Sequence, residues 1–298
     1  MKNILIIGCG LLGSSLLRRI QKKRMANKIY IYEKSKSNIA KIKKLKLPGI
    51  IIKKFEDGVV KADLIILCTP MNEYKNLILR MNKCLLSKTI ITDIGSSKIE
   101  SSKIIKKFLR KDISWTQSHP IAGSEVSGPE HGRQDIFEDK WCVLIKEKNT
   151  KKNHLNILNK FWKKIGSKIV IMSPEKHDKI FSITSHLPHL IAYNLVKSAQ
   201  DFEKIQNYDL IKYSAGGLRD FSRIAASNEI MWRDIFFNNK KNILKAINLF
   251  IKNLNSFKKD INSKNNKSIL KKLIQTKKVR TKIIKLKQDV NKPDFGRS

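Results

Sequence analysis

The chain has 298 residues, with 62 Lys and Arg against 25 Asp and Glu, so its formal net charge is +37; this length allows two domains, each with its own core. Lysines occur in every segment, aromatic residues are sparse and no recognised nucleic-acid motif is present, so we expect no specific nucleic-acid partner. Four cysteines without paired spacing, together with the lack of a signal peptide or an apolar span, predict a cytoplasmic protein with reduced thiols and no membrane attachment.

The amino terminus is typical of a dinucleotide-binding unit. An apolar run at 3–7 predicts a buried parallel strand, and an amphipathic stretch at 16–25 predicts a helix. Between them lies the glycine loop Gly8-Cys9-Gly10-Leu11-Leu12-Gly13. Gly8 allows a tight turn, Gly10 lets a pyrophosphate approach the backbone, and Gly13 lets the helix pack close to the strand. This order predicts nucleotide binding by residues 8–13; the alternatives are a tight turn in an unrelated protein and a site for S-adenosylmethionine.

The identity of the nucleotide is indicated by the second apolar run, at 28–32, which ends at Glu33. A carboxylate at the tip of the second strand accepts hydrogen bonds from an adenosine ribose diol and repels a 2′-phosphate. We therefore expect NAD as the cofactor. Lys34 and Lys36 leave some room for the 2′-phosphate of NADP.

Further apolar runs predict strands at 62–68, 89–93, 113–117, 141–146 and 168–172, with a helix at 152–165. This alternation predicts an α/β fold with one doubly wound, largely parallel sheet of the Rossmann type, to which all these strands belong. Ligands of such sheets lie beyond the carboxyl ends of the strands. Thr69, Ser96 and His119 are all expected at that edge.

His119 stands in the segment 118–129, which is rich in small and polar residues and follows the predicted strand 113–117. An imidazole titrates near neutral pH, so a histidine in such a loop can accept a proton from a substrate hydroxyl while a cofactor takes the hydride. An isolated histidine in such a loop is more often a structural or surface residue. The assignment therefore depends on the rest of the chain.

The pattern becomes helical after residue 172, which predicts a dinucleotide-binding domain at 1–171 and a helical domain at 172–298. Ser173 is the expected N-cap of the first helix, with Pro174 at its first position. The tail from 263 onward is Lys-rich and is expected to form a helix with a disordered end at 291–298.

Polar side chains share one face of that first helix, because they follow at spacings of four, three and four residues: Asp178, Ser182, Ser185 and His189. Pro188 interrupts the helix by removing the hydrogen bond to the carbonyl of Thr184. Local capping by Asp178 and packing of the histidines are the alternatives to a functional role. No cluster has the spacing of metal ligands, so no metal site is expected.

Three motifs resemble those of the prephenate and arogenate dehydrogenases of tyrosine biosynthesis: the segment 118–141, the sequence Ser185-His186-Leu187-Pro188-His189, and the run SAGGLRDFSRIA at 214–225. The resemblance extends to about residue 257. It implies an NAD-binding domain, a helical substrate domain that forms a homodimer, and the oxidative decarboxylation of prephenate or arogenate as small-molecule substrate.

The resemblance also implies roles for individual residues. His119 would be the catalytic histidine, and Ser96 its partner or a partner of the substrate hydroxyl. His189 would be a substrate-site residue, Arg223 would bind a substrate carboxylate, and Asp178 would be a structural partner near Arg223. Trp232 matches an aromatic residue of the family's substrate domain, for which we favour a role in core packing.

Two other classes of function remain open. A 3-hydroxyacid dehydrogenase of similar architecture would use a lysine in its second domain, where this chain offers His119 and Arg223. A basic nucleic-acid-binding or NAD-sensing protein could keep the fold without catalysis. The presence of His119, Ser96 and Arg223 argues against that second alternative.

Overall fold

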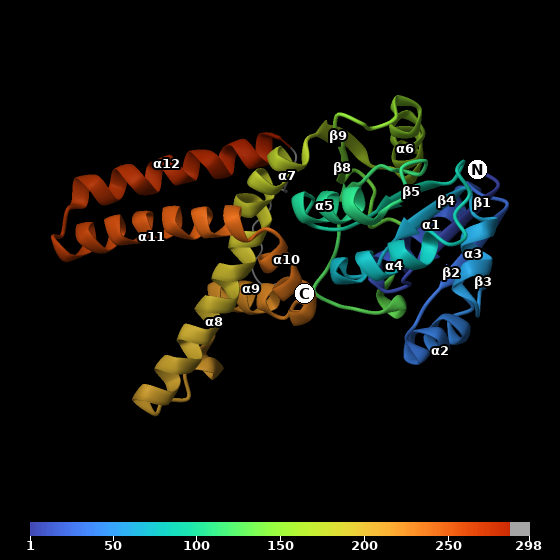
Figure 1. Cartoon of the computed structure of the whole chain (residues 1–298). Coiled ribbons are helices and arrows are strands. Elements are labelled where there is room, and N and C mark those ends of the chain that lie inside the picture. The colour runs from blue at the N-terminus through green and yellow to red at the C-terminus, as the bar shows by residue number, and fades with distance from the viewer. Residues whose placement is uncertain (287–298) are drawn as a thin grey trace. The chain divides into compact units, whose positions relative to one another are not determined.

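The computed structural model describes residues 1–286 (Figure 1). These residues divide into two compact units. The sheet unit comprises Met1–His186 and Ala226–Lys240, and the helical unit comprises Leu187–Ala225 and residues 241–286. The predicted boundary at residue 171, between a dinucleotide-binding and a helical domain, stays a prediction.

The main sheet of the sheet unit is parallel, in the order β3-β2-β1-β4-β5-β6. Its strands are β1 (Asn3–Ile7), β2 (Lys28–Tyr32), β3 (Ile50–Ile51), β4 (Leu64–Leu67), β5 (Ile90–Asp93) and β6 (Ser114–Trp115). This is the strand order of a doubly wound dinucleotide-binding sheet. The predicted fold class is therefore confirmed, while the short strand β3 was not predicted.

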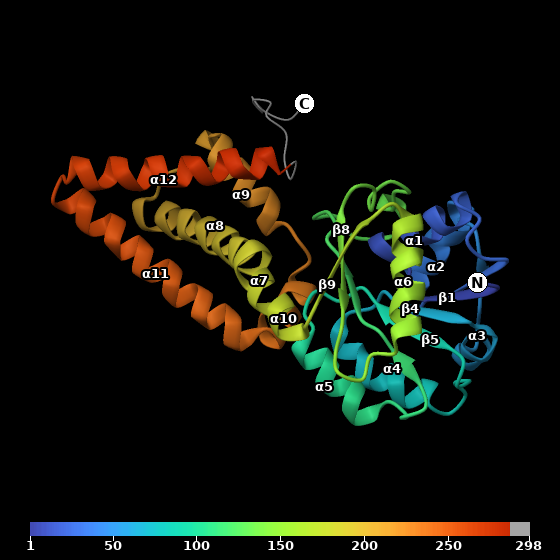
Figure 2. The same cartoon turned by 90° about the horizontal axis from the view of Figure 1, so that it is seen from above.

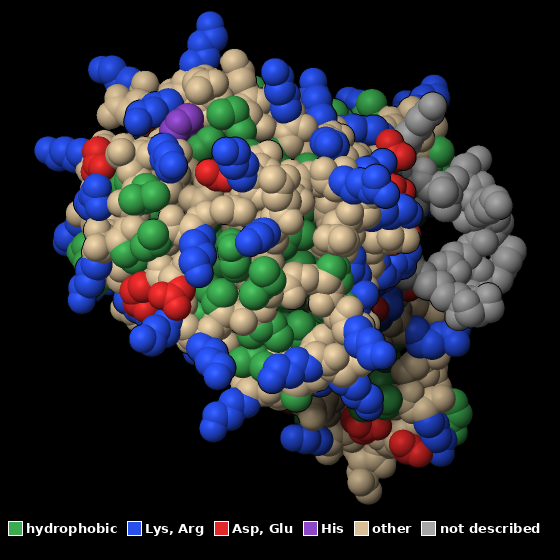
Figure 3. All heavy atoms as spheres, turned by 90° about the vertical axis from the view of Figure 1, so that its right-hand side faces the viewer, with side chains coloured by type: hydrophobic (Ala, Val, Ile, Leu, Met, Phe, Trp, Pro, Cys, Tyr) green, Lys and Arg blue, Asp and Glu red, His purple; other side chains and the backbone are tan. Residues whose placement is uncertain are grey.

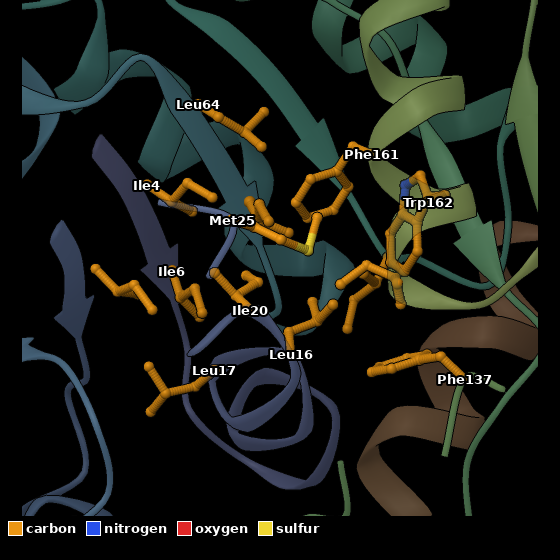
Figure 4. Packing of buried hydrophobic residues seen from close by; sticks show 14 of the residues in the cluster. Ile4, Ile6, Leu16, Leu17, Ile20, Met25, Leu64, Phe137, Phe161 and Trp162 are labelled. Carbon is orange, nitrogen blue, oxygen red and sulfur yellow. The ribbon is translucent and has the colours of Figure 1, made fainter. Parts of the chain in front are cut away.

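Helices cover both faces of this sheet because its strands are apolar on both sides. In β1, Ile4 and Ile6 belong to one core cluster, whereas Leu5 and Ile7 belong to the other. The first cluster includes residues of α1 (Leu11–Lys22) and α6 (Lys152–Ile165), and Figure 4 shows its close packing around Leu16. The second includes residues of α3 (Phe55–Lys61) and α4 (Tyr74–Met81). The unit also holds α2 (Lys36–Lys44), α5 (Ile99–Phe108), α7 (Pro174–Phe181) and α10 (Glu229–Asn238).

A second, smaller sheet corrects two of the predictions. It consists of β7 (Ser118–Pro120), antiparallel to β8 (Trp141–Ile145), and β9 (Lys168–Met172), parallel to β8. The prediction that the strands at 141–146 and 168–172 continue the main sheet is wrong. The main sheet ends at the two-residue strand β6, and the next strand, β7, pairs with β8 in the second sheet. The placement of His119 in a loop is also wrong, since this residue lies within β7.

The helix that follows Met172 begins as predicted. The Ser173 hydroxyl accepts a hydrogen bond from the Lys176 N–H at 3.2 Å, and Pro174 occupies the first helical position. Between α7 and α8 (Leu187–Gln206) lies a π-helical turn at Ser182–His186, which ends two residues before Pro188. The shared face predicted for residues 178–189 assumed a regular α-helix, and this turn breaks that regularity.

The helical unit contains α8, α9 (Gly216–Ala225), α11 (Lys240–Asn262) and α12 (Asn266–Lys285). Helices α8 and α9 pack against each other. Figures 1 and 2 both show α11 and α12 side by side, where Lys272 Nζ donates to Asp260 Oδ2 at 2.6 Å. The predicted helix in the Lys-rich tail is thus confirmed, and its end at 291–298 lies outside the described residues. No helix within residues 1–286 is long and apolar enough to cross a membrane.

Candidate functional site

In the glycine loop, Gly8 and Gly13 are packed closely against neighbouring backbone, whereas Gly10 is open. Gly8 has a φ of 88°, and a Cβ there would lie 2.8 Å from the Cys68 carbonyl oxygen. A Cβ on Gly13 would lie 2.1 Å from the Gly8 carbonyl oxygen, so no larger residue fits there. By contrast, nothing lies within 4 Å of a Cβ built on Gly10, and α1 begins directly after that residue. A backbone that is open at the N-terminus of a helix fits the approach of a pyrophosphate.

Glu33 and Thr69 extend this edge at the ends of β2 and β4. Glu33 Oε2 accepts a hydrogen bond from the Cys9 N–H at 2.7 Å, so the carboxylate lies against the glycine loop. The Thr69 hydroxyl oxygen is buried and has no hydrogen-bond partner within residues 1–286. Since an unpartnered buried hydroxyl is costly, Thr69 is a candidate ligand contact. Lys34 Nζ lies 2.6 Å from Glu73 Oε2. One of the two lysines near Glu33 is therefore already paired with a carboxylate.

His119 is the first member of a buried chain of hydrogen bonds. Its Nδ1 lies 2.7 Å from Nε2 of His177, and Nδ1 of His177 lies 2.7 Å from Oδ1 of Asp178. The Asp178 carboxylate also accepts from the Lys98 N–H at 2.8 Å and from the Ile99 N–H at 2.9 Å. His177 and Asp178 are fully buried, whereas His119 retains 8% of its surface.

A buried ion pair lies next to this chain. Lys98 Nζ is 2.7 Å from Asp93 Oδ2, and both side chains are fully buried. Lys98 Nζ also donates to the Ser118 carbonyl oxygen at 2.7 Å, and the Tyr74 hydroxyl donates to Asp93 Oδ2 at 3.0 Å. The end of β5, the start of α5 and the strand that carries His119 are thereby joined.

The electrostatics of the site favour neutral histidines. Burial, followed by the charges of His177 and Lys98, lowers the pKa of His119 well below its usual range. Burial, followed by Lys98, lowers the pKa of His177 to about 2. The contact between His177 and Asp178 is therefore a hydrogen bond from a neutral ring to a carboxyl group rather than an ion pair. Burial raises the pKa of Asp178, whose backbone donors act in the opposite direction.

The other residues predicted for the site lie as follows. Ser96 is half-buried just after β5, and among the described residues the side chain of His119 is hydrogen-bonded to His177 rather than to Ser96. His189 lies in α8 and Arg223 in α9, both half-buried in the helical unit, whereas Asp178 belongs to the sheet unit. The roles of Ser96, His189 and Arg223, and the pairing of Asp178 with Arg223, stay predictions.

Sequence reasoning missed His177, Lys98 and Asp93. The signals that could have found them are the adjacent His177-Asp178 pair and the acidic end of the strand at 89–93, followed five residues later by a lysine. No group of three or more metal-ligating residues occurs in the part of the chain that the structure describes.

Comparison with known proteins identifies the family. The model described as "Prephenate dehydrogenase, nucleotide-binding domain" matches residues 16–171, and that described as "Prephenate dehydrogenase, dimerization domain" matches residues 173–276. The chain belongs to the prephenate dehydrogenase family. Like the family, it is an oxidoreductase that uses NAD, so the resemblance found in the three motifs is confirmed.

Individual relatives in this family cover most of the length of the chain. The cyclohexadienyl dehydrogenase of Zymomonas mobilis is 33% identical over 279 residues, which are 94% of this chain and 95% of the relative. The prephenate dehydrogenase of Bacillus subtilis is 31% identical over 257 residues, which are 86% of this chain and 69% of the relative. The crystal structure of Aquifex aeolicus prephenate dehydrogenase with hydroxyphenyl propionate and NAD+ superposes with a TM-score of 0.88 at 34% identity, covering 95% and 98% of the two chains.

Proposed function

We propose that this enzyme converts prephenate to 4-hydroxyphenylpyruvate, or arogenate to tyrosine, with His119 as the residue that contacts the reacting hydroxyl. In this reaction the hydrogen on C4 of the ring leaves as a hydride, the ring carboxylate leaves as carbon dioxide, and the ring becomes aromatic. NAD, when bound, accepts the hydride. The hydroxyl on C4 ends as a phenol, so the step needs a hydrogen-bond acceptor for it and no net proton transfer.

The observation that carries this proposal is the burial of His119 against His177, which favours a neutral imidazole. A protonated ring would repel the positive charge that develops at C4 as the hydride departs. A neutral ring nitrogen can instead accept a hydrogen bond from the C4 hydroxyl. Burial and nearby Lys98 keep the pKa of His119 low, so the neutral form prevails at neutral pH. Ser96, at the end of β5, is proposed as a second contact to the hydroxyl or to His119.

Substrate binding is assigned to the helical unit through two residues. Arg223 offers a planar guanidinium that matches a carboxylate with two parallel hydrogen bonds, and His189 offers a further polar contact to the substrate. Both lie in helices that pack against one another, α9 and α8. The test of the proposed activity is purified enzyme with NAD and either prephenate or arogenate, followed at the absorbance of NADH; no NADH formation with either would contradict it.

The cofactor contacts are proposed at Gly8, Gly10, Leu11, Leu12, Gly13, Glu33 and Thr69. The support is the open backbone at Gly10, the placement of Glu33 against the loop, and the unpartnered hydroxyl of Thr69 among the described residues. These features fit the pyrophosphate and the adenosine ribose of a dinucleotide.

Glu33→Ser is expected to lower kcat/KM with NAD by about 10- to 100-fold, the cost of losing hydrogen bonds to a charged group, and to narrow the preference over NADP. The measurement is steady-state kinetics with each cofactor. Glu56→Ser is the matched control, because Glu56 pairs with Arg80 on the surface at 2.9 Å. Wild-type enzyme with a higher kcat/KM for NADP would show that Glu33 does not face the ribose.

The assembly and location are proposed as a homodimer in the cytoplasm. The match to a dimerization domain supports the homodimer, and the four free cysteines are compatible with a reducing compartment. Figure 3 shows Lys and Arg side chains scattered over the face in view rather than gathered in one stripe. Together with the spread of lysines along the whole sequence, the scatter on this face favours the interpretation of the charge as compositional, without a specific nucleic-acid partner.

A further inference from the structure

We propose that His177 is a positioning residue: it holds His119 in the tautomer with hydrogen on Nδ1, so that Nε2 of His119 offers its lone pair to the substrate. This inference rests on the proposed role of His119 as the contact to the reacting hydroxyl. It concerns a residue that touches neither substrate nor cofactor in the proposed function.

Asp178 determines which nitrogen of His177 carries the proton. Backbone N–H groups of Lys98 and Ile99 bind its two oxygens at 2.8 and 2.9 Å, and these groups can only donate. The carboxyl group is therefore held as an acceptor, and its Oδ1, 2.7 Å from His177 Nδ1, receives the ring hydrogen there. A neutral imidazole with hydrogen on Nδ1 has its lone pair on Nε2.

The tautomer of His177 in turn determines that of His119. Nε2 of His177 lies 2.7 Å from Nδ1 of His119, so a lone pair on the former requires hydrogen on the latter. His119 then keeps its own lone pair on Nε2. Within residues 1–286 this nitrogen has no hydrogen-bond partner, and it is not fully buried, so it is accessible to a ligand.

While Asp178 accepts from its two backbone donors as a carboxylate, the opposite arrangement requires a charged His177 with hydrogen on both nitrogens. Its Nε2 would then donate to Nδ1 of His119, and Nε2 of His119 would become a donor that cannot accept the substrate hydroxyl. Full burial of His177 opposes that charge, and so does the ammonium group of Lys98. The ordinary way to stabilise a charged histidine, a nearby free carboxylate, is weakened because Asp178 is already bound by two backbone donors.

Phe181 holds the two rings in place from α7. Its ring centroid lies 4.5 Å from that of His177 and 5.1 Å from that of His119. Removal of His177 could therefore act through packing as well as through the proton. The test must separate these two effects.

Two amide variants of His177 make the separation. Glutamine carries its terminal amide at the distance of Nε2 from the backbone and can still accept from His119, whereas asparagine carries it at the distance of Nδ1 and cannot reach His119. Both lose the ring and its contact with Phe181. We expect His177→Asn to lower kcat by about 10- to 100-fold, the loss typical of removing the outer hydrogen-bond partner of a metal-bound histidine, with little change in KM or NAD affinity. His177→Gln should recover most of this loss.

The tautomer itself is measured by nitrogen NMR of full-length enzyme labelled with 15N-histidine and saturated with NAD. The chain contains six histidines, and the signals of His119 are assigned by their loss in His119→Asn. We expect hydrogen on Nδ1 of His119 in the wild type and in His177→Gln, and a shift toward hydrogen on Nε2 in His177→Asn. Thermal unfolding reports whether the variants fold.

The results test the positioning role of His177 and the proposed role of His119 separately. Hydrogen on Nε2 of His119 in the wild type overturns the positioning role, whatever the variants do. Equal losses of kcat in His177→Asn and His177→Gln with an unchanged tautomer also overturn it, because they indicate a packing role. Normal turnover of His119→Asn would overturn the proposed function of His119 and leave the tautomer result standing.

Discussion

His119→Asn is expected to lower kcat by about 10²–10⁴-fold, the range for a general acid–base group, while NAD affinity stays unchanged. Asparagine places its amide where Nδ1 of the ring lies, so the contact with His177 can persist while the acceptor at the Nε2 position is lost. The loss should fall on kcat, because the hydrogen bond to the hydroxyl strengthens only as C4 gives up its hydride. Steady-state kinetics and an NAD titration make the measurement.

The control for this variant is His154→Asn, since His154 is a half-buried histidine on α6 that makes none of the contacts of the hydrogen-bond chain. That variant should keep wild-type kcat. Near-normal turnover of His119→Asn would remove His119 from the chemistry.

The pH dependence of the wild type follows from the direction of the His119 shift. His119 can accept a hydrogen bond only when neutral, and its pKa in the fold lies well below the usual value of about 6.5 because the ring is buried. Activity should therefore persist as the pH falls through about 6.5 and fail only at lower pH. An acid limb of kcat/KM centred near 6.5 would contradict this expectation.

The stability of the fold should decrease as the pH falls below about 6.5. His119 and His177 stay neutral in the folded state, while in the unfolded state they bind protons below about 6.5. The unfolded state therefore binds more protons, and the free energy of unfolding should decrease as the pH falls below that value. Circular dichroism across the same pH range separates loss of fold from loss of activity.

Local patterns in the sequence were enough to predict the cofactor edge. A glycine loop between an apolar strand and an amphipathic helix occupies contiguous residues, and Glu33 stands directly after the next strand. The N-cap at Ser173 was likewise found because the cap, the proline and the first turn are adjacent in sequence.

The hydrogen-bond chain could not be predicted in this way, because its members meet across long sequence separations. His119 and His177 are 58 positions apart, and Lys98 and Asp178 are 80 apart. The second sheet escaped prediction for a related reason. An apolar run at 141–146 indicates a strand, yet it carries no information on which edge that strand pairs with.

Arg223→Ala is expected to raise KM for prephenate and arogenate by an amount equivalent to ~2–5 kcal/mol, the range for leaving the partner of a buried charge pair unsatisfied. The substrate side-chain carboxylate is present in the ground state and in the transition state, so its loss of binding should appear in KM more than in kcat. Arg223→Lys should already be harmful, because an ammonium makes a point contact where a guanidinium forks onto both oxygens. NAD affinity should not change.

Arg219 supplies the matched control for this prediction. It lies four residues before Arg223 in the same helix, α9, and is exposed, so Arg219→Ala removes the same charge from the same unit. Any general effect of net charge on an anionic substrate should appear equally in both variants, since it acts at long range and is screened by salt. A specific anchor should instead give a rise in KM that is confined to the Arg223 variants and survives at high ionic strength. An Arg223→Ala enzyme with wild-type KM for both substrates would rule out the anchor and leave recognition of the carboxylate to another residue.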